Sequence, residues 1–382
     1  MSYIHFTDEQ YENLRVTYRK WWKGELNRPI VPFVTHGYET KMAPTKAPLL
    51  GFTTAWDFSI DPRQFIEAHT YALSSQRFHG EAYPIFFTQR FGAGAMAAFL
   101  GCKPKSAPNT IWFLPEKQTP IEELHFEYDE NNVYWRRVLN TIEAAQEAWR
   151  GQVVIGMPDL GGILDVLASF RNAEDLLMDL IDDPDEVLRC VKELQELWFV
   201  YYNKINDILR PEAKGYSQWF NVYGEEPGYM LQSDFSYMIS PDMFRQFVGW
   251  ELSSTADRMT NAIYHMDGIG EIPHLDQLLA IDGIKGIQWQ PGEGTAMSMN
   301  WDDLLKRILA SGKKLLSWNQ KPDGSPIDFA DPGQLYFGTR YYGPKQWEDA
   351  RRYADMYGIK MDMPGDKSDE SNVLLTAKYR WE

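Results

Sequence analysis

Cysteine is scarce in this chain of 382 residues, which contains only Cys102 and Cys190. The two lie far apart, and neither has a neighbour at the spacing of a metal motif. This excludes a disulfide scaffold and favours a cytosolic setting. No base lies near either cysteine in the sequence, so catalysis by a thiol nucleophile is not expected.

Long apolar runs are also missing, since no stretch approaches the roughly 18 residues that a membrane span needs. The segment Met1–Lys23 is polar and charged, unlike a signal peptide. We therefore expect a cytoplasmic protein that does not enter a membrane.

Positive charge is in deficit, because 54 acidic residues face 38 lysines and arginines and give a formal net charge of −16. Such a chain is not expected to bind nucleic acid or an anionic membrane. The hydrophobic share of 44% allows a large core. The aromatic share of 14% suits a bulky core and also an aromatic-lined pocket for a small molecule.

Apolar segments indicate eight strands, near residues 30, 84, 153, 215, 262, 286, 315 and 335. Helical patterns separate most of them, and this alternation predicts an α/β fold with parallel strands. Eight such units predict a (β/α)8 TIM barrel with insertions. The alternative is a doubly wound open sheet, but its glycine fingerprint is missing after the first strand, where Val34–Tyr38 stands.

The chain is divided here into an N-terminal helical extension (residues 1–28), the barrel (residues 29–363) and a polar C-terminal tail (residues 364–382). A helix is expected over Thr7–Lys23, with its first residue as the cap, and another over Asp61–Phe78.

The strongest candidate site is the end of the strand near residue 262, where His265 and Asp267 precede Gly268. Residues two apart on a strand point to the same face, and barrels keep their chemistry at the carboxyl ends of their strands. The pair could share a metal ion or act as a base and its orienting group. The alternative is structural, with Asp267 forming a turn into Gly268.

The other candidates form two groups. Polar residues follow predicted strands, and aromatic residues would surround the opening of the barrel near His265. For each aromatic residue the alternative is ordinary packing. One of Glu225, Glu226 and Asp234, in an expected long loop after the fourth strand, could add a third metal ligand or a general acid. We assign catalysis to His36, Asp159, His265 and Asp267, and substrate binding to Gln89, Trp219, Tyr229, Asp234, Gln288, Trp289, Trp318, Asn319 and Arg340.

Four segments resemble the uroporphyrinogen decarboxylase superfamily: Leu180–Val187, Ser233–Phe235, Ile239–Phe244 and His265–Gly268. That superfamily also holds corrinoid-linked zinc methyltransferases and cobalamin-independent methionine synthase. The resemblance covers residues 150–357 well and the preceding residues poorly. It implies a (β/α)8 barrel and, by analogy, a homodimer.

The chain departs from the family pattern at positions that determine substrate and metal binding in the family. Uroporphyrinogen decarboxylases carry an arginine-rich segment after the first strand, where this chain has Val34–Glu39, and an aspartate after the second, where it has Thr88–Arg90. A tetra-acid porphyrinogen is therefore not expected as substrate. The zinc methyltransferases use His-x-Cys and a later cysteine. Here Asp267 takes the place of the first cysteine, and Trp318–Gln320 contains none.

The resemblance implies a metal-assisted methyltransferase or demethylase that acts on a small or aromatic substrate with a corrinoid protein as partner. Zinc would be held by His265 and Asp267, since zinc accepts imidazole and carboxylate ligands. The second hypothesis is a decarboxylase (a carboxy-lyase) without metal, in which Arg340 holds the substrate carboxylate. The third is a barrel that binds a ligand without catalysis.

Overall fold

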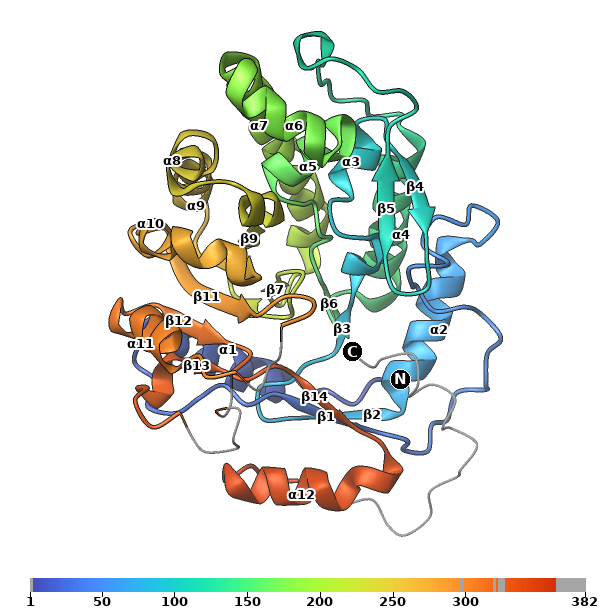
Figure 1. The fold of residues 1–382 in the computed structure, drawn as a ribbon. Helices are drawn as coiled ribbons and strands as arrows, with labels where there is room; N and C mark the ends of the chain where they lie inside the picture. The colour runs from blue at the N-terminus through green and yellow to red at the C-terminus, as the bar shows by residue number, and fades with distance from the viewer. Residues whose placement is uncertain (1–2, 296–298, 319–320, 322–326, 362–382) are drawn as a thin grey trace.

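The computed structural model describes residues 3–295, 299–318, 321 and 327–361. Short strands occupy the middle of the molecule and helices lie around them (Figure 1). The strands that take part in parallel pairing are β1 (Phe33–His36), β3 (Ile85–Phe86), β6 (Val154–Ile155), β7 (Tyr216–Ser217), β9 (Met230–Gln232), β10 (Ala262–Asp267), β11 (Ile284–Gln290), β12 (Lys314–Leu316), β13 (Leu335–Tyr336) and β14 (Arg340–Tyr342).

Parallel pairing forms two runs. One continues through β9–β10–β11–β12–β13 and, by a bridge from Tyr336 to Ile30, reaches the segment that becomes β1. The other joins β3 to β6 and, by a bridge from Gly156 to Ser217, to β7. The antiparallel strand β2 (Gln76–His79) lies beside β1. The fold is thus mixed α/β with parallel strands, and pairing among the described residues does not close the two runs into a ring.

Helix α1 (Asp8–Trp22) covers the amino-terminal ends of these strands. It starts at Thr7 with a capping box and buries one apolar face. The Tyr11 hydroxyl donates to the carbonyl of Gln152, just before β6, at 3.0 Å. The helix shares one buried cluster with side chains from six of the parallel strands and from the segment before β1: Ile30, Ile85, Val154, Met230, Ile263, Leu316 and Tyr336, packed on Tyr11, Leu14, Tyr18 and Trp21. The opposite, carboxyl-terminal end is left for polar residues.

The outer helices pack largely against one another, with α4 between α2 and α7. Their bounds are α2 (Pro62–Ser74), α3 (Met96–Phe99), α4 (Val133–Trp149), α5 (Ile163–Arg171), α6 (Ala173–Asp182), α7 (Pro184–Leu209), α8 (Pro241–Phe244), α9 (Trp250–Asp257), α10 (Leu275–Leu279), α11 (Asp302–Ala310) and α12 (Trp347–Met356). Two antiparallel hairpins are formed by β4 (Lys103–Ser106) with β5 (Ile111–Leu114) and by β7 with β8 (Tyr223–Gly224). Of the helices described, none is both long and apolar enough to cross a membrane.

Each predicted strand position carries a strand or a bridge, but two expectations were wrong. The helix from Asp61 ends at Ser74, because the chain then pairs with β1 as strand β2. The expected long loop after the fourth strand contains β9, which joins the parallel sheet beside β10. Its apolar run is only Tyr229–Leu231, too short to show a strand pattern without its partner.

Glu251 on α9 is a buried carboxyl group whose replacement should stabilise the protein at high pH. Burial raises its pKa to about 7, opposed by a hydrogen bond from Thr255. Since the folded-state pKa lies above the ordinary value of 4.5, the stability that Glu251 contributes is greatest below pH 4.5 and falls as the pH rises to 7. We expect Glu251→Gln to raise the free energy of unfolding by about 1–3 kcal/mol at pH 8 and by much less at pH 4.

Denaturant unfolding at the two pH values measures this difference. An equal effect of the substitution at both would contradict the buried-carboxyl explanation.

Candidate active site

Three polar residues form a row across neighbouring strands. Gln232 on β9 and Gln288 on β11 are the register partners of His265 on β10. Register partners point to the same face of a sheet. The next partner in the row is Leu316, a member of the buried cluster under α1. The row therefore faces the interior of the strand arrangement, one step toward the carboxyl ends from Met230 and Ile263 of the same cluster.

Both ring nitrogens of His265 face acceptors. Nδ1 is hydrogen-bonded to the side-chain oxygen of Gln288, and Nε2 lies 3.7 Å from Oδ2 of Asp267. Burial disfavours the charged ring, but the Asp267 carboxylate and the charge of Asp234 outweigh it, and together with Gln288 they raise the pKa of His265 to about 9. At neutral pH this side chain is an imidazolium that can donate a proton.

Asp159, which follows β6, is buried beside the same charges. Its Oδ1 accepts from the Gly161 N–H at 3.0 Å and from the Tyr229 hydroxyl at 3.5 Å. The Leu160 N–H donates to Tyr229 at 2.7 Å and holds that hydroxyl in place. Burial and the Asp234 charge raise the pKa of Asp159 to about 7, against the hydrogen bond from Gly161 and the charge of His265. This group can therefore hold or release a proton near neutral pH.

Asp234 follows β9 directly, and its backbone is anchored by a second carboxyl group. Oxygens of Asp165 accept the N–H groups of Asp234 and Phe235 at 3.1 and 2.8 Å. Burial and the charge of Asp267 raise the pKa of Asp234, whereas the charge of His265 lowers it. The side chain itself is open to solvent. We therefore give the charges of His265 and Asp267 more weight than burial at this carboxylate.

The end of β10 is held by Glu271, which is fully buried. Its two oxygens accept the Tyr264 hydroxyl at 2.7 Å and the Asp267 N–H at 2.9 Å. Gly268 follows with a φ of +98°, and a Cβ there would lie 2.8 Å from the Tyr237 ring. A non-glycine residue would meet both backbone strain and a clash, so the turn after Asp267 requires glycine.

Two predicted tryptophans lie on different sides of the sheet. The ring of Trp219 is perpendicular to the His265 imidazole at 5.4 Å between centroids, and its Nε1 donates to the Met230 carbonyl at 2.7 Å. Trp289 follows Gln288 on β11 and so points to the opposite face, where its ring packs on Trp301 at 5.2 Å. Trp219 is thus part of the site, whereas Trp289 packs outside it. Trp318 is buried, and its Nε1 donates to the Trp289 carbonyl at 3.0 Å.

Several predicted residues are not brought to His265. Arg340 pairs in register with Phe33, and its guanidinium lies 4.4 Å from the ring of Tyr353 on α12, outside the sheet. His36 ends β1, burial lowers its pKa, and no interaction between it and His265 is found in the described part of the chain. The remaining predicted residues are placed as follows: Gln89 is buried after β3 with an unpartnered Nε2, Glu225 pairs with Arg19 of α1, Glu226 is exposed, and Asn319 lies outside the described residues.

A metal site is incomplete among the residues that the structure describes. His265 and Asp267 supply two donor groups, but no cluster of three histidine, cysteine or acidic side chains able to hold a metal occurs in residues 3–295, 299–318, 321 and 327–361. The His265 Nδ1 is taken by Gln288. A further ligand would have to come from outside this set.

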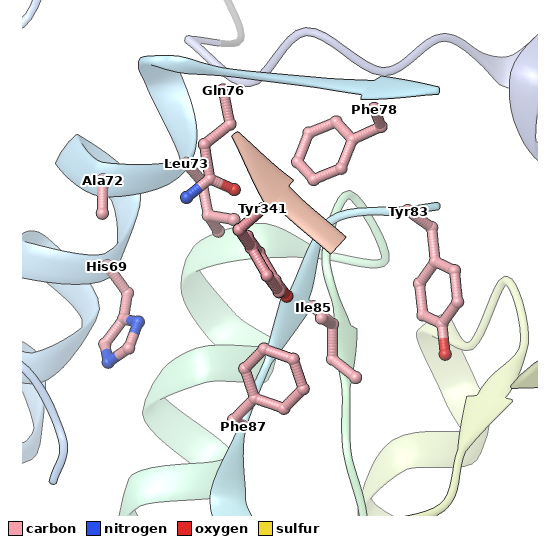
Figure 2. A pocket seen from close by; sticks show the side chains of 9 residues that line it. All are labelled: His69, Ala72, Leu73, Gln76, Phe78, Tyr83, Ile85, Phe87 and Tyr341. Carbon is pink, nitrogen blue, oxygen red and sulfur yellow. The ribbon is translucent and has the colours of Figure 1, made fainter. Parts of the chain in front are cut away.

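A small cavity lies elsewhere, among α2, β2, β3 and β14 (Figure 2). Its volume of about 20 Å³ has room for a single water molecule. Its titratable member, His69, has a pKa of about 3 because of burial and the charge of Arg90, and accepts the Leu50 N–H at 3.2 Å. The lining is otherwise apolar except for Gln76 and the tyrosines, so this cavity does not compete with the row at His265 as a reaction centre.

Three residues of the site were missed in the sequence. Gln232 was missed because β9 was taken for a loop, although the pairing of β9 with β10 places it beside His265. Asp165 on α5 and Glu271 after β10 act by anchoring backbone N–H groups. Glu271 lies four residues after Asp267, a spacing that could have suggested a turn-closing carboxylate.

No model of a known protein family matches the chain, and no curated protein matches its sequence. Among solved structures, the chain is similar to a methyltransferase from Methanosarcina mazei, with a TM-score of 0.50 and 13% sequence identity. The likeness covers 86% of this chain and 93% of that one. At this identity the likeness is one of fold, so the chain shares the arrangement of its strands and helices with a known methyltransferase.

Proposed function

We propose that this chain is a methyltransferase that acts on a small molecule, built on a (β/α)8 barrel of the uroporphyrinogen decarboxylase superfamily. The observation that carries the proposal is the placement of His265 between Gln288 and Asp267 at the carboxyl ends of parallel strands. This is where α/β barrels place catalytic groups. The fold likeness to a methyltransferase and the sequence around His265 support it further.

Methyl transfer from a heteroatom needs help for the leaving group. The bond between carbon and heteroatom breaks, its electron pair stays on the heteroatom, and the acceptor's electron pair forms the new bond to carbon. His265 donates its Nε2 proton to the released heteroatom. Asp267 and Asp234 keep the imidazole protonated before the step. Solvent, or Asp159 with its pKa of about 7, then restores the proton.

The decarboxylase hypothesis has less support. A substrate carboxylate would need a guanidinium partner, and Arg340 lies over Tyr353 instead. Assay of the purified chain with methylated amines, ethers and thioethers, together with a thiol or a reduced corrinoid as acceptor, tests the proposal. Carbon dioxide release from carboxylated aromatic ligands without any methyl transfer would favour the decarboxylase.

Zinc and a corrinoid protein partner are separate proposals, carried by the resemblance alone. If zinc is held at this site, elemental analysis of protein purified without chelator should find about one zinc per chain in the wild type and none in His265→Ala, and His265 would then be a neutral ligand instead of the acid. A lack of metal in both proteins would overturn the zinc proposal and leave the acid role of His265 standing.

A further inference from the structure

We propose that the site at His265 binds a small organic cation, and that methylated ammonium compounds are the substrate class; the second part rests on the proposed function. The first observation is an imbalance of charge. The Asp267 carboxylate lies 3.7 Å from Nε2 of His265, and Asp159 and Asp234 are close enough to act electrostatically on each other and on that ring. None of the ion pairs of the described residues joins a lysine or arginine to any of the three.

The second observation is a buried acceptor without a donor. Gln232 is 4% exposed, and its Oε1 has no hydrogen-bond partner within the described chain. It lies beside His265 in register and on the same face. The Oδ1 of Asp267 also lacks a partner. A buried acceptor is costly unless it is satisfied, so the ligand should bring an O–H or N–H group to this place.

The third observation is an aromatic ring next to His265. The half-buried Trp219 lies 5.4 Å from the His265 ring and is held in place by its bond to the Met230 carbonyl. Aromatic faces attract quaternary ammonium groups, and neighbouring carboxylates add to that attraction. An anionic ligand would instead meet an excess of carboxyl groups without a guanidinium, so carboxylates and phosphates are disfavoured.

Methyl transfer from such a substrate breaks one bond, forms another and ends with a proton transfer. The C–N bond of a quaternary ammonium breaks and leaves its electron pair on nitrogen. The methyl carbon bonds to the electron pair of a nucleophile such as a thiolate or a reduced corrinoid. The neutral amine then takes the Nε2 proton of His265 and leaves as an ammonium ion, with Asp234 beside it.

Three ligands of one shape and different charge test the inference by calorimetry at fixed ionic strength. They are choline, its neutral carbon analogue 3,3-dimethyl-1-butanol, and the anion 3,3-dimethylbutanoate. We expect choline to bind about tenfold or more tightly than the alcohol, and the carboxylate to bind weakest. Equal affinities, tighter binding of the carboxylate, or no binding of choline at millimolar concentration would overturn the inference.

Three variants identify which residues give the preference for choline. Asp234→Asn should weaken choline about tenfold and leave the alcohol unchanged, whereas Gln232→Met should weaken both hydroxyl ligands by a similar factor. Asp303→Asn removes an exposed carboxylate on α11 and should change neither. If Asp234→Asn fails to fold, the comparison of the three ligands on the wild-type chain still decides. Methyl transfer from neutral donors without cation binding would overturn this inference alone. Cation binding without methyl transfer from any donor would overturn the proposed function, and the substrate class with it, but would leave the cation site standing.

Discussion

Replacing His265 by glutamine is expected to slow methyl transfer by about 10²- to 10⁴-fold, the usual contribution of a positioned acid. Glutamine keeps a polar side chain next to Gln288 but has no proton to give to the released heteroatom. With an ether or thioether donor the loss should appear in kcat more than in KM, because the released heteroatom takes the proton in the transition state. Steady-state kinetics with the best methyl donor measures it.

The matched control is His125→Gln, since His125 is exposed and contacts Arg189 and Glu193 on α7. Its activity should equal that of the wild type. A His265→Gln enzyme with more than a tenth of the wild-type kcat would remove His265 from the role of acid.

Asp267→Asn should move the alkaline limit of activity to lower pH. Burial lowers the pKa of His265, but the nearby Asp267 carboxylate and the charge of Asp234 raise it to about 9. An acid acts while it is protonated, so wild-type activity should persist at neutral pH and fall as the pH rises through about 9. Without the Asp267 charge the fall should come at a lower pH, while activity below pH 6 should change less.

The pH dependence of kcat/KM measures this shift, and Asp303→Asn again serves as the control for a lost surface charge. The stability of the fold should depend on pH in the same direction as activity. The raised pKa of His265 stabilises the folded state fully below the ordinary value of 6.5, and this contribution is lost as the pH rises through 9. An alkaline limit unmoved by Asp267→Asn would show that another group sets it.

The centre of the site could be predicted from the sequence because strands repeat every two residues. The apolar run that ends in His265 and Asp267 places both on one face, and the structure brings them within 3.7 Å. Gln288 was also predicted from its strand, and it bonds to His265. Local pattern was sufficient for α1 as well, whose cap at Thr7 and buried face are as expected.

Longer-range features were not visible in the pattern. Strand β9 is three residues long and is stabilised by β10, so its register partner Gln232 could not be recognised. Neighbouring positions on one strand face opposite ways, so Gln288 and Trp289 could not both line the site as predicted, and Trp289 packs on Trp301 instead. Arg340 was chosen for its charge, but its register with Phe33 turns it toward α12.

Titration of the His265 ring by nuclear magnetic resonance tests the central claim most directly. Histidine-labelled wild-type protein is compared with His265→Gln to assign the signal. We predict a ring that stays protonated through neutral pH and titrates near 9, at a lower value in Asp267→Asn. A ring that titrates at or below the ordinary value of 6.5 would contradict the acid role. It would point instead to a neutral imidazole, the form in which histidine binds a metal ion.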